Sequence, residues 1–357
     1  MGPNTMPTPP YVELHAHSAF SFHDGASTPL ELAYAAEAHG YPALALTDHD
    51  GVWGSREFAE SCEGLDLRPI TGTELTVNLA PSETAAEPEL AHLTLLVETA
   101  AGYRNLCRLL TAAHAHTRDN TPRTAMPPWA TLEQLEAHAE GLVCLSGCAR
   151  DGALAGSWER GDTARGERLG RRLLAAFGPD HFRVELQRPY WRRDRARNRW
   201  LALLASRLGV PCVATGNVHS HHPDRADLQD AFVAVRRAEM LEECEPQRRG
   251  NRSSVLAAPE AMARRFAEHP EAVAETLHLA ERLRFDLTRE LGYRYPRSEE
   301  PGADRDLAEL CGHRLAERYR EEPPRRRREA TARLDEELGT IRRLGLSGFF
   351  LLHHELL

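Results

Sequence analysis

The sequence contains no lysine, no long apolar run and no apolar signal core. All 44 basic side chains are arginine, a bias that is typical of a GC-rich genome and carries no functional signal. Because no run of about 18 apolar residues exists, we expect no membrane-spanning helix and no membrane partner. Residues 1–10 are polar and proline-rich. We therefore expect a cytoplasmic protein with a disordered N-terminus over residues 1–10.

Cysteine usage and charge exclude further classes. The seven cysteines are an odd number, and only Cys144 and Cys148 lie close together. This pattern excludes a disulfide framework and a paired CxxC zinc knuckle. The net charge of −9 argues against a protein that coats nucleic acid non-specifically, although local basic patches can still contact phosphates. With 357 residues, 41% of them hydrophobic, the chain can form two or three domains with buried cores.

Short apolar stretches alternate with helical stretches through the first two thirds of the chain. Thr28 supplies an N-cap, Pro29 the first helical position and Glu31 a capping-box partner, and Gly40 ends this helix. The other helices are expected at Ser55–Cys62, Gly102–His114, from Thr131, at Ala164–Phe177 and at Arg193–Leu208. The strands are expected at Tyr11–His15, Ala43–Thr47, Leu75–Leu79, His92–Val97, Leu142–Leu145, Phe182–Leu186 and Pro211–Thr215. This alternation predicts a mostly parallel sheet or barrel with helices packed outside.

The last third of the chain differs in character. Residues 247–254 (QRRGNRSS) are polar, and we expect a linker over residues 246–258 after a barrel over residues 11–245. Residues 259–357 are mostly helical in pattern, with few β-branched residues. The arginine run Arg325–Arg328 is followed by acidic residues, which favours a solvated helix face over a phosphate-binding site.

Potential metal ligands follow the apolar stretches one after another. In a βα barrel the carboxyl ends of the strands form the active face, so these side chains are expected to converge. The clusters are His15-Ala16-His17, His23-Asp24-Gly25, Thr47-Asp48-His49-Asp50, Gly72-Thr73-Glu74, Ala91-His92, Ser146-Gly147-Cys148 and Asn217-Val218-His219.

The residue types in these clusters indicate a multinuclear metal site. His15 and His17 lie two apart, so they share one face of an extended segment. Imidazoles suit zinc and iron, whereas the carboxylates of Asp24 and Glu74 also suit manganese and can bridge two ions. The set exceeds what one tetrahedral zinc can use. Such a site polarises a phosphoryl oxygen and lowers the pKa of a bound water, which favours phosphoester hydrolysis. The remaining expected ligands are the imidazoles of His49, His92 and His219 and the thiolate of Cys148.

Several of these residues have a second interpretation. His23 is an alternative to Asp24, and we prefer Asp24 because Gly25 follows it and a turn would aim the carboxylate. Asp48 is a candidate loop cap, and Cys144 a core residue. Single histidines at strand ends are more often surface or capped residues than ligands. This applies to His39, His114, His138 and His278.

Together the motifs HAH, HDGAS, LTDHDGVWG, GTEL, HLTLL, LSGC and ATGNVH resemble the polymerase-and-histidinol-phosphatase (PHP) domain. The version they resemble opens the bacterial DNA polymerase III alpha subunits, and they are particularly similar to the error-prone branch. After Ala258, PEAMARRFAEHPEAVAET, ERLRFDL and ELGTIRRLGLSGFFLL resemble the first stretch of the polymerase palm. The resemblance covers almost the whole chain. It implies an α/β fold, a distorted seven-stranded βα barrel followed by a mostly helical start of a palm.

The resemblance also implies a site and partners. It implies up to three divalent ions, zinc, manganese or iron, and 3′–5′ exonuclease-like hydrolysis. The implied partners are DNA, as a 3′ end or single strand, the remainder of an alpha subunit, and replisome or repair proteins. The implied catalytic residues are His15, His17, Asp24, Glu74 and His219. The implied metal ligands are His15, His17, Asp24, His49, Glu74, His92, Cys148, Asn217 and His219.

Two departures from the family pattern affect the expected activity. Asn217 stands where the family has aspartate, and a neutral amide is a weaker ligand, so one ion is expected to bind poorly. The chain also stops at Leu357, before the family's palm aspartates, so we expect an amino-terminal piece that does not polymerise DNA by itself. Two alternatives stay open, a free-standing phosphatase such as a histidinol-phosphatase relative and a non-catalytic structural module. Metal content and substrate choice separate them.

Overall fold

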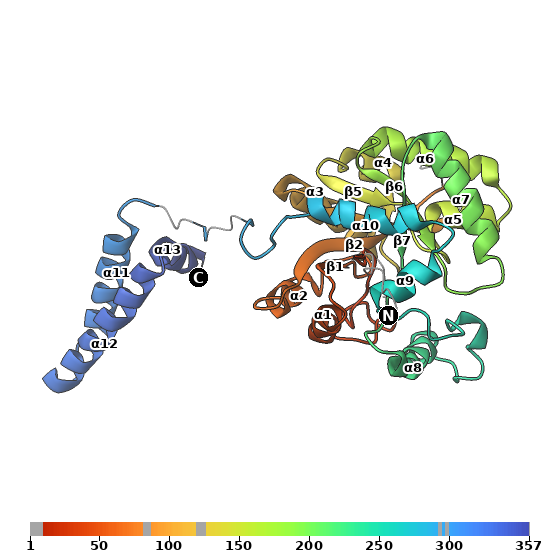
Figure 1. Cartoon of the computed structure of the whole chain (residues 1–357). Coiled ribbons are helices and arrows are strands. Elements are labelled where there is room, and N and C mark those ends of the chain that lie inside the picture. The colour runs from red at the N-terminus through yellow and green to blue at the C-terminus, as the bar shows by residue number, and fades with distance from the viewer. Residues whose placement is uncertain (1–9, 81–86, 119–125, 292–294, 297–299, 357) are drawn as a thin grey trace, which may run out of the picture. The chain divides into compact units, whose positions relative to one another are not determined.

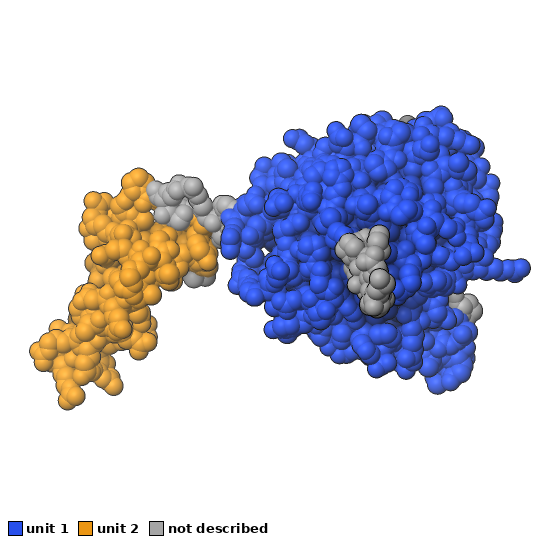
Figure 2. Space-filling model, viewed as in Figure 1, with its two compact units in different colours: residues 1–291 blue, residues 292–357 orange. Residues whose placement is uncertain are grey.

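The computed structural model describes residues 10–80, 87–118, 126–291, 295–296 and 300–356. The predicted disorder of residues 1–10 falls almost entirely outside these ranges. The chain forms two compact units, residues 1–291 and residues 292–357 (Figure 2).

A curled seven-stranded sheet forms the centre of the first unit (Figure 1). Its strands run in the order β1-β2-β3-β5-β6-β7, with β4 beside β2. Most neighbours are parallel, as predicted, but β3 runs antiparallel to both β2 and β5. The strands are β1 (Ala43–Leu46), β2 (Arg68–Asn78), β3 (Leu90–Val97), β4 (Ala130–Thr131), β5 (Leu142–Leu145), β6 (Phe182–Gln187) and β7 (Cys212–Thr215).

The segment of residues 11–17 joins the two edges of this sheet. It makes isolated bridges rather than the regular strand that was predicted for Tyr11–His15. Ala45 N donates to Glu13 O over 2.9 Å on the β1 side. On the β7 side, His17 N donates to Val218 O over 2.8 Å. The curled sheet is therefore closed into a distorted barrel by a segment that carries two of the predicted metal ligands.

Helices pack around the outside of the sheet (Figure 1). The predicted capping box is present at the first of them, because Thr28 N donates to Glu31 Oε2 over 2.9 Å and Glu31 N donates to Thr28 Oγ1 over 3.3 Å. Helices α5 and α8 were not predicted. The helices are α1 (Pro29–Ala38), α2 (Ser55–Ser61), α3 (Ala100–Ala115), α4 (Leu132–Ala137), α5 (Ala153–Glu159), α6 (Thr163–Phe177), α7 (Asp194–Leu208) and α8 (Ala226–Arg237).

The first unit continues past the predicted linker at residues 246–258. Helices α9 (Pro259–Arg265) and α10 (Pro270–Arg282) belong to it. Leu279 and Ala280 of α10, with Leu283, lie in a buried apolar cluster with residues from the strands. The apolar face of α10 packs against the barrel and would be exposed without it, so α10 belongs to the compact unit that ends at Leu291. The division into a barrel over 11–245 and a palm start over 259–357 stays a prediction.

The second unit is helical, with α11 (Ala303–Arg318), α12 (Pro324–Arg343) and α13 (Ser347–Leu356). Ser347 Oγ donates to Asp304 Oδ1 over 2.6 Å, which ties α13 to α11. The arginine run of α12 is a solvated face, as expected, since the Arg325 side chain is 86% exposed and pairs with Glu329. Within the part of the chain that the structure describes, no helix is long and apolar enough to span a membrane.

Candidate metal centre

Glu74 on β2 lies at the centre of the predicted ligand set. Its Oε1 atom is 3.3 Å from His15 Nε2 and 3.4 Å from His92 Nδ1. Its Oε2 atom is 3.6 Å from His17 Nε2 and 2.9 Å from His49 Nδ1. The carboxylate is buried. A carboxylate with two imidazole nitrogens near each oxygen is placed to bridge metal ions.

Asp24 supplies a second carboxylate to the same cluster. Its Oδ2 atom is 3.0 Å from His49 Nε2 and 3.2 Å from His219 Nε2. His49 therefore lies between the two carboxylates. The neighbouring His23 has a positive φ of 61° and an exposed side chain, so the turn separates the two side chains. The structure places Asp24, and not His23, in the cluster.

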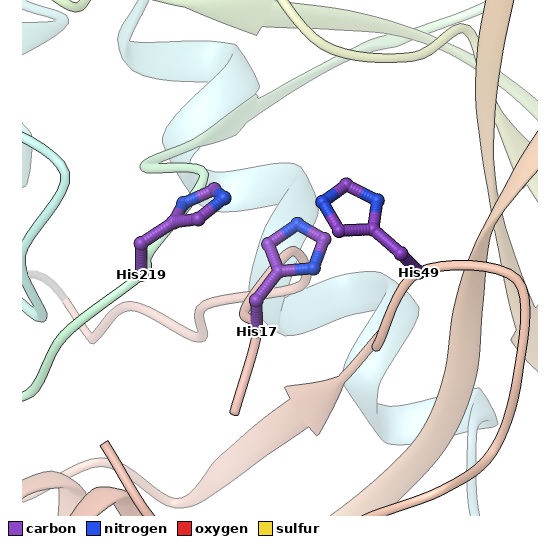
Figure 3. A group of neighbouring side chains, drawn as sticks. All are labelled: His17, His49 and His219. Carbon is purple, nitrogen blue, oxygen red and sulfur yellow. The ribbon is translucent and has the colours of Figure 1, made fainter. Parts of the chain in front are cut away.

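The histidines converge from distant parts of the sequence. The rings of His17 and His49 are stacked with centroids 4.3 Å apart, and those of His17 and His219 are 4.4 Å apart (Figure 3). Each of four groups has ligand atoms within 4.8 Å of one another. The groups are His17, His49 and His219; His15, His17 and Glu74; His49, Glu74 and His92; and His92, Cys148 and Asp151.

A glycine brings Cys148 close to β3. Gly147 has a φ of +91°, and a Cβ there would lie 2.0 Å from the carbonyl oxygen of His92. Only glycine allows this approach, since any side chain would collide with the strand. The loop after β5 therefore brings Cys148 Sγ to 3.8 Å from His92 Nδ1.

Several buried polar atoms of the cluster have no hydrogen-bond partner among the described residues. They include His15 Nε2, His17 Nε2, Glu74 Oε1 and Asn217 Oδ1. Buried polar groups in proteins are nearly always paired, so these four atoms are candidates to bind an ion. Imidazole nitrogens combined with carboxylate and amide oxygens suit zinc, manganese or iron. The residues present therefore fit divalent metal ions.

Comparison with known proteins assigns this part of the chain to a family. The family described as PHP domain matches residues 13–189. Residues 13–189 are a PHP domain. The match begins in the barrel-closing segment and ends just after β6. It includes seven of the nine predicted ligands, from His15 to Cys148, while Asn217 and His219 lie after it.

Similar proteins match nearly the whole chain and not only the PHP domain. An error-prone DNA polymerase from Symbiobacterium thermophilum is 38% identical over 96% of this chain and 31% of its own length. The DNA polymerase III subunit alpha from Treponema pallidum is 31% identical over 96% of this chain and 29% of its own. The chain thus spans about a third of these relatives. A putative metal-dependent phosphoesterase from Bifidobacterium adolescentis covers 60% of this chain and 89% of its own at 16% identity and a TM-score of 0.40.

Charges within the PHP cluster set the protonation of its histidines. Burial lowers the pKa of His17 well below its usual value, and the neighbouring His49 and His219 lower it further. Burial and the Arg249 guanidinium lower the pKa of His219 to about 4. Both rings are thus neutral near pH 7, the form that binds metal. Burial also disfavours the charged form of His49, but Glu74 and Asp24 outweigh it and raise the pKa to about 9.

A buried carboxylate behind His15, that of Glu185, was missed by sequence reasoning. Glu185 Oε1 on β6 lies 2.7 Å from His15 Nδ1 and also accepts from Gln187 Nε2 over 2.8 Å. This contact holds the His15 ring with Nε2 toward Glu74, as second-sphere carboxylates do in metal sites. A sequence signal existed, because an acidic residue inside a buried apolar strand needs a specific partner.

Arg249 was also missed, because residues 246–258 read as a polar linker. Its Nη2 atom lies 3.3 Å from Asp24 Oδ1 and also contacts His219 Nε2. With Arg150 and Arg236 it lines a cavity of about 390 Å³, which also contains Asp24, Glu74 and most of the other predicted ligands. We call this space the metal cavity. Three arginines thus line the same cavity as the ligands, and one of them, Arg249, contacts two of the ligands directly.

The alternative interpretations are resolved by contacts. Asp48 accepts hydrogen bonds from Ser18 N over 2.8 Å and Gly54 N over 3.1 Å, so it caps the loop. Cys144 is buried in β5 as a core residue. The His114 Nε2 atom contacts Asp50 O at 2.8 Å and stays outside the four groups.

Proposed function

We propose that this chain is the amino-terminal part of an error-prone DNA polymerase III alpha subunit. We further propose that its PHP domain binds up to three zinc, manganese or iron ions and hydrolyses phosphodiester bonds at the 3′ end of single-stranded DNA. The observation that carries this proposal is the set of unpaired buried ligand atoms below a cavity lined by arginines. The proposed partners are the remainder of the polymerase and replisome or repair proteins, and the proposed location is the cytoplasm.

The chain supplies the ligands and the phosphate contacts in this proposal. His15, His17, Asp24, Glu74 and His219 would be the catalytic ligands, supported by His49, His92 and Cys148. Bound ions would polarise a phosphoryl oxygen and lower the pKa of a water. The guanidinium groups of Arg150, Arg236 and Arg249 would orient the phosphate, because the guanidinium fork matches phosphate oxygens.

Asn217 is proposed to reduce the activity. Its φ is 49°, a left-handed conformation that asparagine and aspartate both tolerate, and its side chain lines the metal cavity. An amide oxygen contributes no charge, so the ion it faces would be held more weakly than by a carboxylate. Asn217→Asp should therefore restore a ligand without straining the backbone.

The test is metal content of the purified chain together with manganese- or zinc-dependent cleavage of a 3′-labelled single strand. Wild type is compared with His15→Ala, Asn217→Asp and the control His278→Ala. The His278 side chain is 65% exposed, pairs with Glu275 and belongs to none of the four ligand groups. We expect cleavage to be lost in His15→Ala, raised in Asn217→Asp and unchanged in the control. Near-zero metal and no cleavage in all variants would refute the enzymatic proposal.

A non-catalytic structural module is the second candidate, and Asn217 favours it. This module would bind metal through the remaining ligands and stabilise the barrel without cleaving any phosphate ester. Bound metal with no cleavage, even in Asn217→Asp, would support it. Hydrolysis of small phosphate esters without DNA cleavage would instead indicate a free-standing phosphatase.

A further inference from the structure

A strongly basic groove lies where β6 leads into α7. Residues 188–199 contain six arginines and one acidic residue, in a chain whose net charge is −9. A groove of about 520 Å³ is lined by Arg188, Arg192, Arg193, Arg195 and Arg199, together with Tyr190 and Trp191. We call it the arginine groove. Its charge contrasts with the acidic balance of the whole chain.

Nearby carboxylates do not neutralise the groove. Asp194 is buried and pairs with Arg197 at 2.8 Å. Glu268 lies 3.0 Å from Arg195 and Glu159 lies 3.6 Å from Arg193, both at exposed positions where such pairs are weak. Among the described residues, Arg192 and Arg199 have no carboxylate partner, and both side chains are exposed. The groove therefore keeps a positive charge that can bind an anion.

Trp191 connects the arginine groove to the metal cavity. It lines the groove, and its Nε1 atom lies 3.5 Å from Arg249 O. The guanidinium carbon of Arg150 lies 5.3 Å from the centre of the Trp191 ring. Because Arg150 and Arg249 line the metal cavity, Trp191 lies between the groove and the cavity and contacts residues of the cavity lining. A single extended polyanion can therefore contact both.

The groove also presents an aromatic side chain. Tyr190 is 57% exposed and has a φ of 63°, which is unusual for a bulky residue. The guanidinium carbons of Arg188 and Arg265 lie 5.5 Å and 5.4 Å from its ring centre. Arginines combined with exposed aromatic rings are typical of surfaces that bind single strands, since phosphates pair with arginine and bases stack on planar groups. An acidic peptide would use only the charges.

We propose that the arginine groove holds the backbone of a single-stranded nucleic acid whose 3′ end lies in the metal cavity. The placement of the 3′ end rests on the proposed function. Binding of the strand to the groove does not require hydrolysis, so the two can be tested separately.

Binding is measured first, with the full chain and a fluorescent 12-nucleotide DNA strand in EDTA, which prevents cleavage. The variant Arg192→Glu/Arg199→Glu is compared with Arg168→Glu/Arg171→Glu, which makes the same charge change on exposed positions of α6. Each lost phosphate contact lowers the salt slope by about 0.7, so loss of two weakens binding about 25-fold at 0.1 M salt. The control should bind like wild type. Equal binding by all three, or equal weakening in both variants, would overturn the proposal.

Cleavage then distinguishes the groove from the chemistry. With manganese, the long strand is compared with the p-nitrophenyl ester of thymidine monophosphate, which is too short to reach the groove. We expect the ratio of strand to ester cleavage to fall in the groove variant and to stay constant in the control. An unchanged ratio would contradict the groove. If wild type cleaves neither substrate, the proposed function fails, and the binding measurement still decides the groove.

Discussion

Replacing Glu185 with glutamine tests whether its buried carboxylate, which contacts His15, supports the metal centre. The Glu185 and His15 side chains are both fully buried, and their contact of 2.7 Å is a short charge-assisted hydrogen bond. Glutamine keeps the shape but removes the charge, so His15 becomes a weaker and less firmly oriented ligand. Loss of such a second-sphere partner typically lowers metal affinity about 10- to 100-fold. This corresponds to about 1.4 to 2.7 kcal/mol.

The assay is a competition titration of manganese or zinc against a chromophoric chelator at pH 8. Glu275→Gln is the matched control, because Glu275 is also a mostly buried carboxylate, held by Arg183 at 2.6 Å, but contacts none of the predicted ligands. It should lower stability without lowering metal affinity. If Glu185→Gln binds metal within twofold of wild type, the role assigned to the His15 contact is wrong. Equal losses in both variants would show that general destabilisation causes the effect.

Three further measurements test the site and the fold. Metal must displace protons from His49, whose pKa is raised to about 9, and from His15 and His92, whose pKa values neighbouring carboxylates also raise, so affinity should rise by at least about tenfold per pH unit from pH 7 to 9; chelator competition over this range checks this, and a pH-independent affinity would contradict it. Thr28→Ala removes the capping box of α1 and should cost about 1 kcal/mol in a urea titration. Gly102→Ala should cost about 2–4 kcal/mol, because a Cβ would lie 1.9 Å from Gly141 O, whereas Gly312→Ala meets open space and should be neutral or slightly stabilising.

Local patterns were enough to predict most elements of the barrel. The helix after Thr28 was predicted because both residues of its capping box, Thr28 and Glu31, lie within one turn of the chain. Helices α2, α6 and α7 begin and end within about one residue of the predicted ranges. The clusters at strand ends were informative, because parallel strands bring their carboxyl ends to one side of a sheet. His219 follows β7 and reaches the site for this reason, whereas Glu74 lies within β2 and Asp24 lies in the loop after the barrel-closing segment.

Long-range pairing explains what sequence reasoning missed. The antiparallel direction of β3 depends on which strands it contacts, and its own residues do not encode that choice. Residues 11–15 have a strand-like pattern, yet they make only isolated bridges because they span two sheet edges. Arg249 lies in a polar loop, so its neighbours in sequence do not mark it as a site residue. Its approach to Asp24 depends on the path of the whole loop.

Closure of the barrel by residues 11–17 has a consequence during synthesis. The segment with His15 and His17 leaves the ribosome before its partner Val218 and the ligand His219, which follow β7. Contacts between such distant parts of a chain form late in folding. His15 and His17 therefore stay exposed in the nascent chain until residues 218–219 have been synthesised. A site that needs both His17 and His219 can therefore hold metal only after the barrel has closed.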